Sequence, residues 1–236
     1  MSAARSAGAG RPGTARGDAK PGGAIGEARF VLLTGFGPFG SEPDNPSERV
    51  VRALDGTRLP GGTLVRGRVL PVAFDGARAA LAAVLAEGVP ALALGLGLAG
   101  SRREISVERV ALNLADAPIP DALGAQPDDR PLSDDGPPAR FATLPVKGLV
   151  AALRAAGHPA GLSLSAGSYV CNAVLYALLE KLEPLGVPAG FLHLPRAEVW
   201  PLERQVEAVR LALATAAAAA AGGPGADLQG LGGAIE

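Results

Sequence analysis

Short apolar runs alternate with longer segments of helical periodicity along most of this chain. The apolar runs predict strands, and the longer segments predict helices, of which the first two are expected to be capped by Asn45 and Asp75 and several end near Gly. Strands are expected at 30–35, 63–72, 91–97, 107–114, 161–167 and 189–195, and helices at 46–55, 75–87, 144–157, 171–182 and 201–220. Because alternating strands and helices build a parallel sheet covered on both faces, we predict an α/β fold. The expected arrangement is a single-domain three-layer α/β/α sandwich with a mostly parallel, doubly wound sheet.

The two ends of the chain lack this alternation. Residues 1–28 and 222–236 are rich in Gly, Pro and Ala, so we expect a disordered N-terminal tail and a flexible C-terminal tail around a domain at 29–221. The first segment has no continuous apolar run of the kind a signal peptide needs. The apolar stretch at 91–100 is too short to cross a membrane. We therefore expect a soluble protein without a membrane partner.

Net charge and cysteine content indicate which partners and which cell compartment to expect. The 236 residues carry a formal net charge of −1, which gives no electrostatic reason to expect a nucleic-acid partner. The single cysteine, Cys171, excludes an intrachain disulfide and fits a reducing cytoplasm. One polar excursion, at 115–139, is dense in Pro, Asp and Gly. A segment of that kind inside a compact domain is usually functional or disordered.

A glycine-rich loop follows the first predicted strand. Gly35, Gly37 and Gly40 have the G-x-G-x-x-G spacing of a dinucleotide-binding loop. The next helix starts too late for that role, however, and Pro38 removes an N–H group where phosphate donors are needed. The loop also carries two phenylalanines at the carboxyl end of a strand, where α/β sheets place ligands. These rings either meet a small flat apolar ligand or belong to the core.

Three residues could form a nucleophilic site. Cys171 lies at the predicted start of a helix, whose N-terminus stabilises a thiolate. His193 lies inside an apolar strand, where it could serve as the base, and Glu108 begins another strand and could orient the imidazole. A structural cysteine, a satisfied core histidine and a solvated glutamate are the open alternatives. His158, in a turn before a proline, is expected to be solvated.

No cofactor or metal is expected. The chain has only two histidines and one cysteine, and they do not form the closely spaced ligand pairs of a zinc site.

Several segments together resemble the pyroglutamyl peptidase I family, also called pyrrolidone carboxyl peptidases, which are cysteine peptidases with an α/β/α architecture. The matching segments are VLLTGFGPFG with NPS (31–47), LAGSRREISVERVALNL (98–114), IPD with QP (119–127), SAGSYVCNAVLYALL (165–179) and GFLHLP (190–195). They occur in the family's order and extend over most of residues 30–195.

The resemblance implies a reaction and a site. Cys171 would be the nucleophile, His193 the base and then the acid, and Glu108 the orienting acid. The residues that would bind substrate are Phe36, Phe39, Asn45, Ile119 and Val170, with the two rings packed on the pyrrolidone ring. The reaction would release the N-terminal pyroglutamyl residue of a peptide through a thioester. The family also implies a homotetramer.

This chain departs from the family pattern near the site. Pro118 stands where many members have Arg, Leu98 where Gln is common, and Val72 where Thr is frequent. These changes could lower activity or alter the leaving group accepted. Three hypotheses therefore remain: a pyroglutamyl peptidase, a homologue that binds pyroglutamyl ligands without efficient hydrolysis, and a nucleotide-binding α/β protein.

Overall fold

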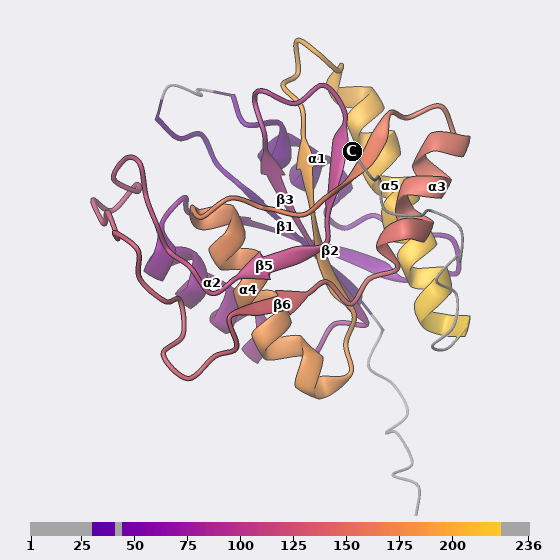
Figure 1. Cartoon of the computed structure of the whole chain (residues 1–236). Helices are drawn as coiled ribbons and strands as arrows, with labels where there is room; N and C mark the ends of the chain where they lie inside the picture. Colours follow the sequence, from indigo (N-terminus) through magenta and orange to yellow (C-terminus); the bar gives the residue numbers. More distant parts are fainter. Residues whose placement is uncertain (1–29, 41–43, 223–236) are drawn as a thin grey trace, which may run out of the picture.

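A six-stranded sheet forms the centre of the computed structural model, which describes residues 30–40 and 44–222 (Figure 1). Its strand order is β2-β1-β3-β8-β4-β7. The strands are β1 (Phe30–Phe36), β2 (Leu64–Leu70), β3 (Leu92–Leu98), β4 (Ile105–Glu108), β7 (Ala160–Ser163) and β8 (Ala189–Leu194). Neighbouring strands pair in parallel except β4 and β8, which are antiparallel. The expected mostly parallel sheet is therefore confirmed.

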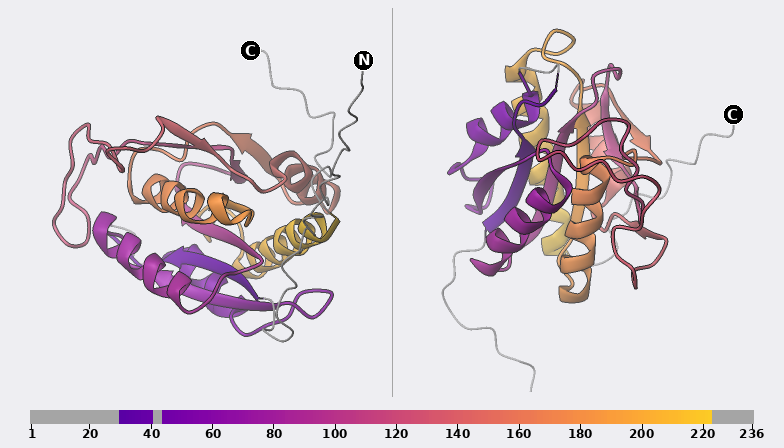
Figure 2. Two further views of the ribbon diagram at one scale, coloured as in Figure 1. Left: turned by 90° about the horizontal axis from the view of Figure 1, so that it is seen from below. Right: turned by 90° about the vertical axis from the view of Figure 1, so that its left-hand side faces the viewer.

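Helices cover both faces of the sheet (Figure 2). They are α1 (Pro46–Leu54), α2 (Phe74–Ala86), α3 (Val146–Ala155), α4 (Val170–Leu182) and α5 (Leu202–Gly222), with a short 3-10 turn, η1 (Glu183–Leu185). Helices α1 and α3 each pack against α5 on one face, and α2 packs against α4 on the other. The three-layer α/β/α arrangement predicted from the sequence is confirmed.

Side chains that alternate between the two faces of the sheet divide the core into two clusters. Along β1, Val31 and Leu33 belong to the cluster under α1, α3 and α5, whereas Leu32 and Phe36 belong to the cluster under α2 and α4. Alternate residues of a strand point to opposite faces, so a continuous apolar strand fills both layers. Burying each large apolar side chain completely contributes roughly 1.5–3 kcal/mol to the free energy of unfolding.

The predicted strand at 107–114 is in fact two strands in different sheets. Its first part is the end of β4, and its second part, β5 (Val110–Leu112), pairs antiparallel with β6 (Ala139–Phe141). The chain leaves the main sheet at Arg109, whose N–H still donates to the Ser163 carbonyl at 2.9 Å. The hydrophobic pattern does not show which sheet a strand joins. Periodicity alone therefore could not detect that the chain passes from one sheet to the other at Arg109.

The segment between β5 and β6 lies outside α4, on the side away from the sheet (Figure 2). Reciprocal backbone hydrogen bonds of 2.7 and 3.0 Å join Ala115 to Arg130 within it. The Tyr176 hydroxyl, from α4, donates to the Pro137 carbonyl at 2.9 Å. This covering segment (residues 113–138) explains why α4 is buried around nearly its whole circumference.

Two local expectations are wrong. Asp75 does not cap α2, because the cap position is Ala73 and the first N–H group, that of Phe74, donates to the Asp121 carboxylate at 2.9 Å. His158 is buried, not solvated, and its ring packs 5.8 Å from that of Trp200. The sequence could not reveal either partner, because both are distant along the chain.

Among residues 30–40 and 44–222, no helix is long and apolar enough to cross a membrane. The tails expected at 1–28 and 222–236 lie outside the described residues, except that Gly222 is the last residue of α5.

Candidate active site

The antiparallel pairing of β4 with β8 places a glutamate beside a histidine. His193 is opposite Ser106, so Glu108, two residues further along β4, lies on the same face of the sheet. The His193 Nδ1 atom is 2.7 Å from the Glu108 Oε1 atom. Both side chains are buried, and Glu108 is 0% exposed. Two residues that are 85 positions apart in the chain therefore form one hydrogen-bonded pair.

Cys171 completes the group from the next layer. It is the second residue of α4, and His193 pairs with Gly97 of β3 in the parallel register. A Cβ atom on Gly97 would be only 2.9 Å from the Cys171 sulfur. The sulfur therefore lies over a glycine that is the direct strand neighbour of His193, and only glycine leaves room for it there.

The protonation states favour an ion pair at this site. Burial lowers the pKa of His193, but hydrogen bonds to Cys171 and Glu108 and their charges raise it, and the resulting pKa is about 9. Burial also raises the pKa of Glu108, yet interactions with His193 and Ser163, the charge of His193 and, to a smaller extent, Arg102 keep this pKa below its ordinary value. At neutral pH the imidazole is therefore protonated and faces a charged carboxylate.

The start of α4 is held in place by a residue that sequence reasoning missed. Asn172 is fully buried, and its side-chain oxygen accepts a 2.9 Å hydrogen bond from the Leu112 N–H. Its amide donates to the carbonyls of Leu112 and Leu114 at 2.9 and 3.0 Å. This residue ties the helix that bears Cys171 to the covering segment. An Asn within a helical pattern was the available signal, because Asn rarely improves a helix interior.

The glycine loop is tied to α1. A Cβ atom on Gly35 would be 2.7 Å from the Ser47 carbonyl oxygen, so glycine permits the close approach of the helix. The Phe36 N–H donates to the Ser47 hydroxyl at 3.0 Å. Asn45 caps α1 by accepting from the Ser47 N–H at 3.1 Å, and its amide donates to the Gly37 carbonyl at 3.0 Å. The predicted cap at Asn45 is confirmed.

Aromatic rings extend from this loop to the reactive group. Phe36 is buried, with its ring 6.5 Å from that of Phe191, which in turn lies 5.1 Å from the His193 ring. Phe39 is half-buried, 5.8 Å from the ring of Tyr169, the residue that precedes α4.

The two other expected pocket residues differ in exposure. Val170 is fully buried as the first residue of α4, whereas Ile119 is 50% exposed. The residues next to these two positions are joined by a hydrogen bond. The hydroxyl of Tyr169, which precedes Val170, donates to the carbonyl of Pro120, which follows Ile119, at 3.1 Å.

Asp121 fixes the segment that follows Ile119. Its carboxylate accepts backbone hydrogen bonds from Phe74, Leu123 and Ala125 at 2.9, 2.8 and 2.9 Å. Burial raises the pKa of Asp121, but these N–H groups outweigh burial and lower it. The carboxylate thereby joins the covering segment to the N-terminus of α2. Sequence reasoning also missed this role.

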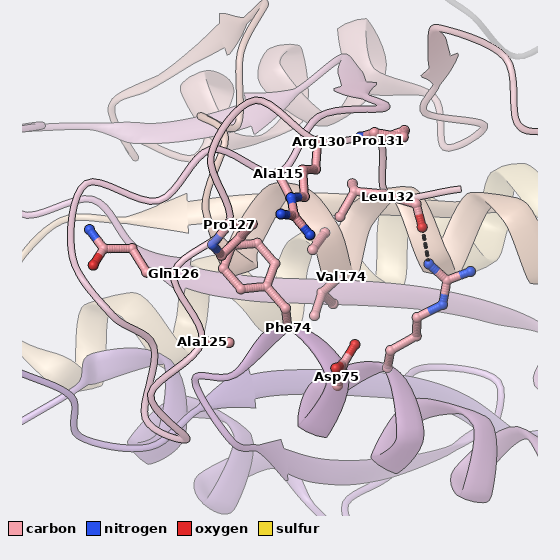
Figure 3. A pocket seen from close by; sticks show the side chains of 12 residues that line it. Phe74, Asp75, Ala115, Ala125, Gln126, Pro127, Arg130, Pro131, Leu132 and Val174 are labelled. Atoms are coloured by element: carbon pink, nitrogen blue, oxygen red, sulfur yellow. Dashed lines mark hydrogen bonds between the residues drawn. The ribbon is translucent and has the colours of Figure 1, made fainter. Parts of the chain in front are cut away.

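A cavity of about 400 Å³ lies beside the site, between α2, the covering segment and α4 (Figure 3). Phe74, Gln126, Arg130 and Val174 line it, and Arg78 donates to the Leu132 carbonyl at its edge. Phe74 also packs edge-on against Tyr169 at 5.4 Å. Cys171, His193 and Glu108 are not among its lining residues, so the cavity and the reactive group are separate.

Within residues 30–40 and 44–222, no group of three or more His, Cys, Asp or Glu side chains could hold a metal ion.

Fold and site together define a class. A thiol beside an imidazole, which a buried carboxylate orients on an α/β sheet, is the arrangement that cysteine hydrolases use. Comparison with known proteins agrees with this class. The family model described as pyroglutamyl peptidase matches residues 29–219, and the chain belongs to this family.

Individual relatives support the assignment. The pyrrolidone-carboxylate peptidase of Klebsiella pneumoniae is 49% identical over 197 residues, which cover 80% of this chain and 92% of that protein. The protein of the same name from Cupriavidus pinatubonensis is 48% identical over 200 residues, covering 79% and 92%.

Solved structures agree. The pyrrolidone carboxyl peptidase of Thermococcus litoralis matches with a TM-score of 0.76 and 38% identity over 80% of this chain and 93% of that one. Pyroglutamyl peptidase I of Bacillus amyloliquefaciens matches with a TM-score of 0.77 and 34% identity over 81% and 98%. The resemblance seen in the sequence is therefore confirmed, and with it the expected class of enzyme.

Proposed function

We propose that this protein hydrolyses the bond that follows an N-terminal pyroglutamyl residue in peptides, with Cys171 as nucleophile. The observation that carries the proposal is the group of Cys171, His193 and Glu108 in a member of this family: the imidazole is hydrogen-bonded to Glu108 and interacts with the Cys171 thiol. In this reaction the thiolate attacks the pyroglutamyl carbonyl carbon, and the oxygen becomes an oxyanion. The N-terminus of α4, which has no side-chain cap, offers N–H groups and a positive dipole to that charge.

His193 moves the protons. Its imidazolium donates a proton to the leaving amine as the tetrahedral intermediate collapses to a thioester. The neutral imidazole then takes a proton from water, which attacks the thioester and releases pyroglutamate and the thiolate. Glu108 keeps the imidazole in one orientation and stabilises its positive charge throughout.

Phe36, Phe39, Ile119 and Val170 are the residues that we propose to surround the substrate ring. Pyroglutamate has no charged amine, so apolar walls suit it. Half-buried Phe39 and half-exposed Ile119 still have surface available to a ligand. The ring amide must find partners as it is buried, because an unpaired polar group costs about 1–3 kcal/mol. Since the side-chain oxygen and nitrogen of Asn45 both hydrogen-bond to the chain, we propose that Asn45 acts by shaping the loop.

The direct test is fluorophore release from a pyroglutamyl amide under reducing conditions. We expect the wild-type protein to cleave this substrate and to leave the matching prolyl amide intact, because proline lacks the ring carbonyl. Cys171→Ser should remain folded and lose turnover. Full turnover in Cys171→Ser would refute the proposed nucleophile. A folded wild-type protein that binds pyroglutamate but cleaves nothing would instead indicate the binding-only homologue that Pro118 and Leu98 allow.

We also propose a homotetramer working in the cytoplasm. The lone cysteine is the proposed nucleophile, and a reducing compartment keeps it as a thiol. Light scattering coupled to size-exclusion chromatography tests the tetramer, which a mass of one or two chains would contradict.

A further inference from the structure

One oxygen of Glu108 has two cationic partners. The Oε1 atom that lies 2.7 Å from His193 Nδ1 also accepts a hydrogen bond of 2.7 Å from the Nη1 atom of Arg102. Arg102 lies in the turn after β3, where its N–H donates to the Ala99 carbonyl at 3.0 Å. Its side chain is 31% exposed, whereas that of Glu108 is fully buried. The arginine therefore reaches the buried acid from the surface.

The same guanidinium also contacts the segment that leads to the nucleophile. Its Nη2 atom donates to the Ser165 carbonyl at 3.2 Å. Ser165 lies between β7 and α4, six residues before Cys171. Arg102 thus bridges the strand that holds the acid and the loop that sets the start of the helix.

We propose that Arg102 is a positioning residue for this reaction. Its guanidinium holds Glu108 in the orientation that His193 requires and anchors the strand-to-helix loop before Cys171. This inference rests on the proposed function. Arg102 is not expected to touch the substrate, because its guanidinium is bound to Glu108 and to the Ser165 carbonyl.

Physical chemistry supports a role beyond general stability. A carboxylate without exposure to water is costly unless its charge is paired and hydrogen-bonded. His193 supplies a positive charge only while it is protonated, and it gives up that proton during turnover. Arg102 stays charged at every stage, so it keeps Glu108 ionised and in place when the imidazole is neutral.

Arg102 also tunes the imidazole. The charged or titratable groups next to His193 in the described part of the chain come from three elements: Cys171 from α4, Glu108 from β4 and Arg102 from the turn after β3. A further arginine, Arg196, lies just beyond β8 and donates to the Gly100 carbonyl. Arg102 and the imidazolium share one carboxylate oxygen. Removing the arginine leaves that negative charge to His193 alone, so the pKa of His193 should rise.

Arg102→Met tests the proposal, with Arg103→Met as the matched control. Arg103 is the next residue, is exposed, and forms no ion pair with residues 30–40 or 44–222. In Arg102→Met we expect kcat to fall at least about 10-fold with little change in KM, because geometry at the reacting atoms changes and the pocket does not. The alkaline limb of the kcat profile should move to higher pH by about one unit. Arg103→Met should match the wild type.

Arg102→Lys separates charge from bridging. Lysine keeps the positive charge but cannot reach two acceptors with a planar fork. We expect a wild-type alkaline limb with an intermediate kcat. A wild-type kcat in Arg102→Lys would contradict the bridging role. If Arg102→Met fails to fold, the kcat of Arg102→Lys still tests whether Arg102 positions Glu108 and the loop before Cys171.

An NMR titration of His193 gives a readout that does not need turnover. The chain has only two histidines, so the imidazole signals can be assigned with His158→Gln. We expect the His193 titration to move to higher pH in Arg102→Met and to stay unchanged in Arg103→Met. Identical titrations and identical kcat profiles in the two variants would overturn the proposal. A wild-type protein without peptidase activity would refute the proposed function and still leave this titration to test Arg102.

Discussion

Two buried carboxylates in this protein have different partners. Glu108 binds the side chains of His193 and Arg102, whereas Asp121 binds three backbone N–H groups. Both have a pKa held below the ordinary value despite burial. Backbone N–H groups do not ionise at ordinary pH and so are not acid–base partners for a carboxylate; the contacts of Asp121 hold two segments together. A carboxylate that faces an imidazole can instead support proton transfer.

Replacing each acid by its amide should separate these two roles most sharply. In Glu108→Gln the imidazole loses its charged partner, so we expect kcat to fall about 10³–10⁴-fold while the protein stays folded. Fluorophore release and circular dichroism measure the two effects. If Glu108→Gln kept kcat within a few-fold of wild type, the imidazole would not depend on this acid.

Asp121→Asn should mainly affect stability and substrate affinity. Hydrogen bonds to a charged acceptor contribute about 1.5–3 kcal/mol each, and the amide group cannot accept through its nitrogen. We expect a loss of roughly 2–4 kcal/mol in the free energy of unfolding. KM should rise about 10-fold because Ile119 loses its support. A change confined to kcat would contradict this assignment.

The contribution of the Asp121 carboxylate to the free energy of unfolding should depend on pH. Because the folded pKa is lowered, the carboxylate stabilises the fold at pH values above its unfolded pKa. This contribution is lost as pH falls through the folded pKa. The stability difference between wild type and Asp121→Asn should therefore be full at neutral pH and shrink below about pH 4. Denaturant titrations at several pH values measure it, and a difference that grew in acid would contradict it.

Tyr169→Phe should give the smallest effect. It removes only the 3.1 Å hydrogen bond to the Pro120 carbonyl and keeps the ring contacts with Phe39 and Phe74. We expect a loss of about 1 kcal/mol and a KM change of a few-fold. An unchanged KM would show that this bond does not hold the segment next to Ile119.

The sequence predicted most of the fold because its apolar runs have lengths that separate strands from helices. Among the described residues, five strands of the main sheet and the helices α1 to α5 lie close to the expected ranges, whereas β4 shares only residues 107–108 with the strand expected at 107–114. The pattern could not predict the direction of β4 or the departure of β5, because both depend on which neighbour pairs with the strand. These features are set by long-range contacts such as that between Asn172 and Leu112.

The site was predictable to a similar extent. Cys171, His193 and Glu108 were named from residue chemistry and family resemblance, and the structure brings them together. Arg102 and Asp121 were not named, since charged residues in polar turns usually face water. Asp121 meets Phe74 from 47 positions away, and local sequence carries no trace of that contact.

Covalent labelling tests the central claim most directly. The protein would be reacted with a pyroglutamyl chloromethyl ketone and, separately, with the prolyl analogue, and the adducts located by peptide mass spectrometry. The account predicts one pyroglutamyl adduct on Cys171, almost none with the prolyl reagent, and slower labelling in Glu108→Gln. Equal labelling by both reagents, or an adduct on another residue, would contradict it.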